Sequence, residues 1–136
     1  MNKSYSMLFG DIHNHNAMGY GVGSLERSID VAQGHLDFFA FTGHSSWHDM
    51  KAMEGGRENH WLNGFEVLRN GWPKVQDLIA EANSDGEFAA YLGFEWHSSQ
   101  FGDQCVVFPD DHQPMAYPDH LNDLRRFCVE KNALMI

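Results

Sequence analysis

Short apolar runs alternate with amphipathic stretches along the whole chain. The apolar runs, bounded by glycine, proline or polar residues, predict β-strands over residues 6–13, 37–42, 88–96, 104–108 and 133–136. Between them, apolar residues recur at helical spacing and predict helices over residues 24–34, 58–84 and 118–131. Ser24 is a good N-cap for the first helix, and Gly71, Trp72 and Pro73 predict a break that divides the second into two helices.

This order of elements predicts an α/β fold in a single domain covering residues 1–136. The run 37–42 is almost wholly apolar, which is typical of a parallel strand buried on both faces. Strand and helix follow one another four times, without a last helix, as in a fold built of right-handed βαβ units. The run 104–108 is short and could extend a hairpin from residues 88–96.

Composition narrows the function classes. With 136 residues, 43% of them hydrophobic and 21% charged, the chain has the make-up of one folded domain. Nine Lys and Arg against nineteen Asp and Glu give a net charge of −10, which argues against a nucleic-acid surface and favours cationic partners, above all metal ions. Nine histidines strengthen the expectation of a metal site, because histidine is the commonest metal ligand.

Targeting signals and paired cysteines are not evident. Cys105 and Cys128 form no CxxC pair, so free thiols are expected rather than a disulfide framework or a cysteine-rich zinc site. The first residues lack a signal-peptide core, and no stretch approaches the ~20 apolar residues of a membrane span. We therefore expect a cytoplasmic protein without a membrane partner.

The stretch FGDIHNHN places two histidines at the end of the first predicted strand. His13 and His15 are two residues apart in extended chain, so their side chains point the same way and can hold one ion together. Asp11 could orient one of the rings or act as a ligand itself. An H-N-H nuclease is excluded, because the residues of that motif are spread over a ββα unit and are not adjacent.

The next two strands also end in metal-ligand residues. His44 follows the run DFFAFTG, and Glu95 ends the run YLGFEW, where a carboxylate is costly to bury without a cation and can bridge two ions. Because the carboxyl ends of parallel strands converge, these residues are expected to meet His13 and His15. His97 shares the face of Glu95 only if the strand extends as far as residue 97. Asp103 is a weaker candidate for a metal ligand, because its segment can also be a plain hairpin turn.

These motifs together resemble the PHP (polymerase and histidinol phosphatase) superfamily of metal-dependent phosphoesterases. FGDIHNHN is similar to its first motif, LDFFAFTGHS to its second and YLGFEWHS to its third, in the same order along the chain. The resemblance implies a partial (βα) barrel of about four βα units, with ligands at the C-terminal ends of the strands. It also implies up to three divalent ions, typically Zn, Mn or Fe.

Carried over residue by residue, the resemblance assigns His13 and His15 to one ion, Glu95 to a bridge and His44 to another ion, with Glu95 and His44 catalytic. The chain departs from the family pattern at several positions. Gly43 stands where the family usually has Asp, and Asn16 stands where it has Thr or Ser. Asp103 stands where similar proteins have a histidine, and so is expected to supply an oxygen ligand.

The expected activity is hydrolysis of a small phosphorylated substrate by metal-activated water. Two alternatives remain open: an amidohydrolase-type metal hydrolase, and a non-catalytic, degenerate metal-binding domain. A full barrel needs roughly 250 residues, and this chain supplies about half of one. We therefore expect either the N-terminal part of a longer protein or a reduced form that self-associates through its open strand edges.

Overall fold

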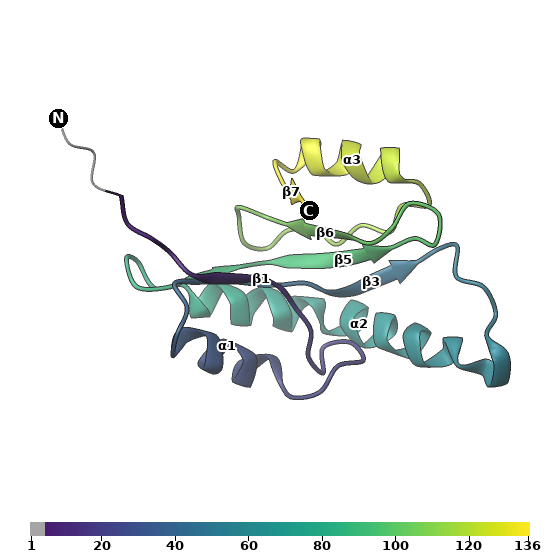
Figure 1. Ribbon diagram of the computed structural model, residues 1–136, viewed down its shortest axis with the longest axis horizontal. Coiled ribbons are helices and arrows are strands. Elements are labelled where there is room, and N and C mark those ends of the chain that lie inside the picture. Colours follow the sequence, from purple (N-terminus) through teal and green to yellow (C-terminus); the bar gives the residue numbers. More distant parts are fainter. Residues whose placement is uncertain (1–4) are drawn as a thin grey trace.

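The computed structural model describes residues 5–136 and has a mixed α/β fold, as the sequence predicts. In chain order the elements are β1 (Gly10–Asn14), α1 (Leu25–Gln33), β2 (Phe38–Phe41), β3 (Gly43–Trp47), the 3-10 turn η1 (Glu54–Gly56), α2 (Glu58–Ala82), β4 (Ala89–Tyr91), β5 (Gly93–His97), β6 (Gln104–Val107), α3 (Leu121–Glu130) and β7 (Leu134–Met135). Helices α1 and α2 lie on one side of the strands and α3 on the other (Figure 1). No helix in these residues is long and apolar enough to cross a membrane.

The strands form two sheets rather than a closed barrel. In the first sheet, β2 lies between β1 and β4, and all neighbours are parallel. In the second, the order is β3-β5-β6-β7, with β3 and β5 parallel and the remaining neighbours antiparallel. The expected hairpin between β5 and β6 is confirmed, and the last predicted strand pairs with β6.

The chain passes twice from the first sheet to the second, at Thr42 between β2 and β3 and at Leu92 between β4 and β5. The prediction of one continuous strand over 88–96 is therefore wrong, and the strand predicted to end at residue 42 continues as β3. Glycine permits the second crossing, because a Cβ atom at Gly93 would lie 2.5 Å from the Val106 carbonyl oxygen and 2.8 Å from that of Phe41. The two crossings lie side by side and carry the candidate site.

The first strand differs from its prediction. Residues 6–9 lie outside β1, which begins at Gly10, and the side chains of Met7 and Phe9 are 80% and 61% exposed. An apolar run predicts burial only when another element covers it, and β1 is an edge strand that pairs with β2 alone in the described part of the chain.

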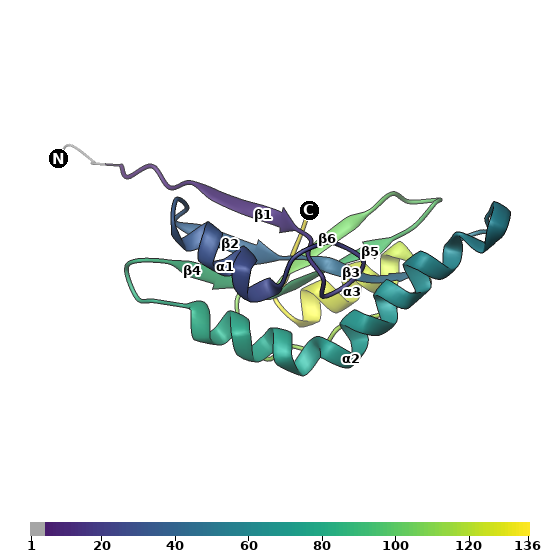
Figure 2. The ribbon, with the colours of Figure 1, turned by 90° about the horizontal axis from the view of Figure 1, so that it is seen from below.

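The predicted break at Gly71, Trp72 and Pro73 is also wrong, because α2 is one helix with Pro73 inside it. The helix is curved (Figure 2), as expected where proline removes a backbone hydrogen bond. Trp72 holds this part of the helix to the protein, since its ring is buried and its Nε1 donates to the Gln113 carbonyl oxygen at 2.9 Å. Tertiary packing thus outweighs the local cost of proline.

The remaining helices agree with the sequence. Ser24 caps α1 by accepting from the Arg27 backbone N–H at 3.2 Å, and His120 caps α3 by accepting from the Asn122 N–H at 3.1 Å. The core lies between the sheets and α2, where Leu68, Val75 and Ile79 are fully buried. Each such side chain contributes about 1.5–3 kcal/mol of transfer free energy, so the core fixes α2 against the strands that carry the site.

Candidate metal centre

His13 and His15 lie together at the end of β1, as predicted. Their Nε2 atoms are 2.9 Å apart, and both rings face the second sheet. The strand end is held by side chains: Asp11 Oδ1 accepts from the His13 backbone N–H at 3.0 Å, and Thr42 Oγ1 accepts from the Asn14 N–H at 3.0 Å. Asp11 therefore shapes the backbone, and it contacts neither imidazole ring.

His44 and Glu95 come from neighbouring parallel strands. They are register partners on β3 and β5, and Glu95 Oε2 lies 2.9 Å from His44 Nδ1. His15 Nε2 approaches the same carboxylate oxygen to 3.3 Å from β1. The convergence expected from three strand ends is therefore present, although His44 and Glu95 lie within their strands rather than beyond them.

His97, which the sequence left open, belongs to this cluster because β5 extends as far as residue 97. Its Nε2 lies 3.9 Å from Glu95 Oε2 and contacts His44 Nδ1, while its Nδ1 lies 2.7 Å from Asp103 Oδ1. Asp103 thus lies beside the cluster, as its sequence assignment requires. Its closest contact is a ring nitrogen of His97 that points away from Glu95.

Three groups of side chains offer ligand atoms within 4.8 Å of one another, and Glu95 is the member that all three share. The groups are His15, His44 and Glu95; His13, Glu95 and Cys105; and Glu95, His97 and Asp103. Sets of imidazole and carboxylate ligands at such spacing suit a divalent transition-metal ion. The described residues thus contain groupings close enough to hold a metal ion, in the place that the motifs indicate.

The surroundings of Glu95 fit a cation. Four imidazole nitrogens, those of His13, His15, His44 and His97, lie within 4.0 Å of Glu95 Oε2. This oxygen is buried and meets the geometric criteria for a hydrogen bond with no partner among residues 5–136, although His44 Nδ1 lies 2.9 Å away. No lysine or arginine pairs with Glu95 in the same residues. A buried carboxylate facing ring nitrogens is costly unless a cation lies between them.

Burial also shifts the pKa values of the candidate ligands. Burial lowers the pKa of His15 to about 4, with the charge of His44 adding to the effect and that of Glu95 opposing it. Burial likewise lowers the pKa of His44, against the opposing influence of Glu95. For Glu95, burial raises the pKa, but the adjoining histidines outweigh it and the net shift is downward. Neutral imidazoles around an ionised carboxylate are the protonation states that metal binding needs.

Sequence reasoning missed two contributors. Cys105 on β6 lies 2.8 Å from His13 Nδ1, the ring nitrogen that faces away from His15, and burial raises the pKa of its thiol to about 12. Tyr20, from the glycine-rich turn after β1, stacks on His44 with 4.3 Å between ring centroids. Neither residue stands at a sequence spacing from the histidines that indicates a shared metal site. The hairpin of β5 and β6 brings Cys105 to the site, and the fold of the turn after β1 brings Tyr20.

Gly43, which precedes His44 on β3, has no room for a side chain. A Cβ atom there would lie 2.5 Å from Phe41 Cζ, 3.0 Å from the Met18 carbonyl oxygen and 3.1 Å from Leu68 Cδ2. A carboxylate at this position has no room in the present packing. Gly43 therefore contributes no side chain to the cluster.

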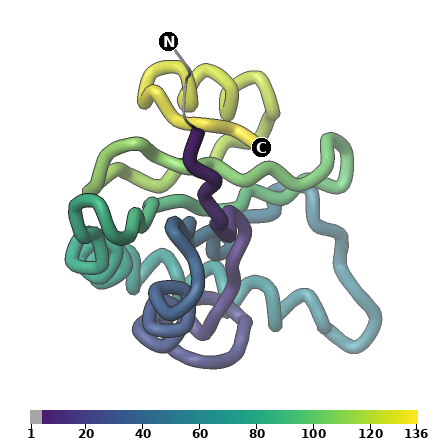
Figure 3. The backbone as a smooth tube through the Cα atoms, turned by 60° about the vertical axis from the view of Figure 1, so that its left-hand side comes forward, coloured from purple at the N-terminus to yellow at the C-terminus, as the bar shows by residue number. Residues whose placement is uncertain are grey.

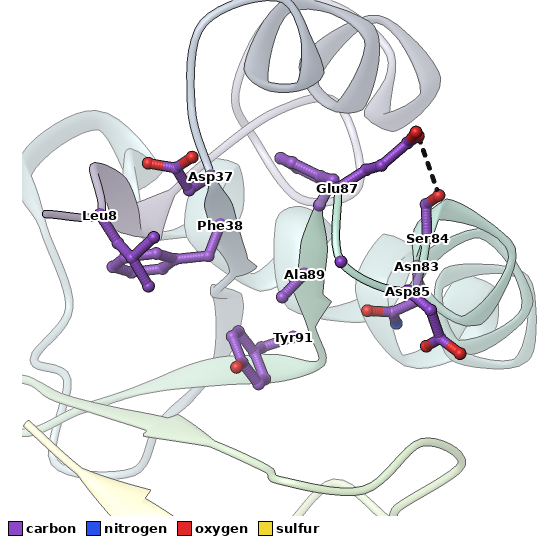
Figure 4. A pocket seen from close by; sticks show the side chains of 11 residues that line it. Leu8, Asp37, Phe38, Asn83, Ser84, Asp85, Glu87, Ala89 and Tyr91 are labelled. Carbon is purple, nitrogen blue, oxygen red and sulfur yellow. Dashed lines mark hydrogen bonds between the residues drawn. The ribbon is translucent and has the colours of Figure 1, made fainter. Parts of the chain in front are cut away.

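A separate hollow lies at the opposite end of the first sheet, where β2 and β4 begin (Figure 4). It has a volume of about 370 Å³ and is lined by Leu8, Phe38, Tyr91 and the turn between α2 and β4. No histidine lines it, and two of its lining residues are joined by the hydrogen bond that Ser84 Oγ donates to Glu87 Oε2 at 3.2 Å. It does not share a residue with the metal-ligand groups.

No protein-family model matches the chain, and no curated protein matches it significantly. Function is therefore inferred from the residues and their geometry.

Proposed function

We propose that the protein is a metal-dependent hydrolase that cleaves phosphate esters, with a partial barrel of the PHP type as its scaffold. The observation that carries the proposal is the buried carboxylate oxygen Oε2 of Glu95, which has four histidine nitrogens within 4.0 Å and no lysine or arginine partner in the described residues. The three motifs that resemble the PHP superfamily supply these residues in the family's order.

The residues divide into ligands and supports. His13, His15, His44 and Glu95 would hold the metal, and Glu95 is the residue that all three possible ligand groups share. His97 and Asp103 lie next to Glu95 and complete the third group of side chains. A divalent ion bound there acts as a Lewis acid toward phosphate oxygens and lowers the pKa of a water molecule.

The protein's own groups prepare the reaction. The lowered pKa values of His15 and His44 keep their rings neutral at pH 7, so their lone pairs stay available. Glu95 and Asp103 are acidic neighbours in a chain with a net charge of −10, and they repel a phosphate until bound cations offset them. Metal content and activity should therefore rise together.

Hydrolysis of an aryl phosphate by protein loaded with Zn, Mn or Fe tests the proposal. We expect turnover by the wild type, loss of turnover after chelation, and recovery when metal is returned. His15→Ala should lose both bound metal and turnover, whereas His112→Asn, which alters an exposed histidine outside the cluster, should lose neither.

Other outcomes would select the alternatives. Cleavage of an acyl amide in place of the phosphate ester would indicate an amidohydrolase-type enzyme. Bound metal without hydrolysis of either substrate would indicate a metal-binding domain without catalysis. Turnover that survives complete removal of metal would overturn the proposal.

A further inference from the structure

Beside the metal-ligand cluster lies a largely apolar hollow of about 380 Å³, lined by Trp47, Met53, Arg57, His60 and Trp61. Its walls come from the end of β3, from the segment that connects β3 to α2, and from the first turns of α2. This segment extends from the body of the protein at one end of the strands (Figures 1 and 3). The volume lies within the roughly 300–1,000 Å³ typical of small-molecule sites.

Aromatic rings connect this hollow, which we call the tryptophan hollow, to the ligand cluster. The Trp47 ring lies 5.4 Å from the His97 ring, measured between centroids. Tyr20 stacks on His44 at 4.3 Å and meets Trp61 edge-on at 4.3 Å. Ring contacts through His44 and His97 therefore connect the ligand cluster to Tyr20 and to both tryptophans of the hollow.

The two lining tryptophans do not act as core residues. Trp72 and Trp96 are 7% and 0% exposed and belong to the hydrophobic core, whereas Trp47 and Trp61 are half-buried. Trp47 is held in place by the hydrogen bond of its Nε1 to Ser99 Oγ at 3.0 Å. Trp47 is thus fixed in position, and both rings are partly open to solvent, so they present faces on which a planar ligand can stack.

We propose that the tryptophan hollow binds the aromatic leaving group of the substrate, so that the enzyme prefers aryl or heteroaryl phosphates to alkyl phosphates. The proposal rests on the phosphoesterase function proposed above. Trp47 and Trp61 supply ring faces, and Arg57 supplies a cation that stacks on the face of an electron-rich ring. The centroids of the Trp47 and Trp61 rings are 6.4 Å apart, with 59° between the ring planes, so the ligand ring lies against the tryptophans rather than between them, with the phosphate at the cluster.

The test compares the binding of two phosphonates that contain no cleavable ester bond. Calorimetry on the metal-loaded protein measures the dissociation constants of 1-naphthylphosphonate and methylphosphonate. We expect the naphthyl compound to bind at least roughly tenfold more tightly, because stacking on an aromatic side chain contributes on the order of one tenfold step in affinity. Trp61→Ala should abolish this preference by weakening the naphthyl compound alone.

Two further variants make the result specific. Trp61→Phe keeps a ring and should retain most of the preference, which separates loss of stacking from a damaged fold. Tyr117→Ala removes a partly exposed ring that contacts Arg69 away from the hollow, and it should leave both constants unchanged. Thermal melting of each variant verifies that it is folded.

The outcomes separate this proposal from the function on which it rests. Equal affinities for the two phosphonates in the wild type, or a preference that survives Trp61→Ala, would overturn the hollow as the binding site. A Trp61-dependent preference in a protein that hydrolyses no phosphate ester would support the hollow and overturn the phosphoesterase function. Failure of both phosphonates to bind the metal-loaded protein would overturn both.

Discussion

Glu95 and His44 are register partners on parallel strands, and the carboxylate oxygen Oε2 of one lies 2.9 Å from the ring nitrogen Nδ1 of the other. Partners in a parallel pair present their side chains on the same face of the sheet, so this contact follows from the alignment of β3 with β5. A shift of one residue in that alignment would turn one of the two away. The site therefore depends on strand register as much as on residue identity.

Glu95→Gln should separate folding from metal binding. Because the adjoining histidines lower the pKa of Glu95, the ionised carboxylate favours the folded metal-free protein at pH 7, so the metal-free variant should fold but melt below the wild type. Saturating Zn or Mn should stabilise the wild type by about 2.7 kcal/mol at a hundred times the dissociation constant, and should stabilise the variant much less. Thermal melting with and without metal measures both effects, and a large metal-induced shift in the variant would contradict the role given to Glu95.

Asp103→Asn should weaken metal binding without unfolding the protein. Asp103 Oδ1 lies 2.7 Å from His97 Nδ1, so it orients the His97 ring, whose other nitrogen, Nε2, faces Glu95. We expect an affinity loss of about 10- to 100-fold with an unchanged number of ions, measured by competition with a chelating dye. Loss of one whole ion would instead make Asp103 a ligand, as the sequence suggests. Asp110→Asn, at an exposed position, is the matched control.

Gly43→Ala should destabilise the protein, because its Cβ atom would lie 2.5 Å from the ring of Phe41 in the core. Overpacking of this kind costs about 1–3 kcal/mol. Gly34→Ala is the control: there a Cβ atom would meet no atom closer than 3.4 Å, and the backbone φ of −72° suits alanine. Chemical denaturation should show a clear loss for the first variant and a change below about 1 kcal/mol for the second. Equal effects would contradict the packing described for Gly43.

Cys105→Ala should alter the position of His13 rather than remove a ligand. The thiol contacts His13 Nδ1 at 2.8 Å, and His13 Nε2 faces His15 and Glu95. An imidazole that binds metal through one nitrogen holds its orientation through the other. Cobalt-loaded wild type should therefore lack a thiolate-to-cobalt absorption band, while Cys105→Ala should bind cobalt more weakly. A strong band that disappears in the variant would make Cys105 a direct ligand.

Much of the fold could be predicted from local patterns. The spacing of Leu25, Ile29 and Ala32, with Ser24 before them, places α1 within one residue, and the stripe of Val75 and Ile79 is buried as the helical period requires. These features depend only on residues that lie a few positions away in the sequence. The predicted break near Pro73 is wrong for the same reason, because the packing of Trp72 against a distant loop is invisible to a local pattern.

The sequence by itself determined which residue types stand at the strand ends: His13, His15, His44 and Glu95 could be named from alternation and from polar groups that follow apolar runs. Only the tertiary structure decided that the chain passes from one sheet to another at Thr42 and Leu92. The second crossing places His97 beside Glu95, the hairpin of β5 and β6 brings Cys105 to the same carboxylate, and the turn after β1 stacks Tyr20 on His44. Side-chain alternation within a strand is fixed by the local backbone, whereas the register between strands is fixed by packing among residues far apart in the chain.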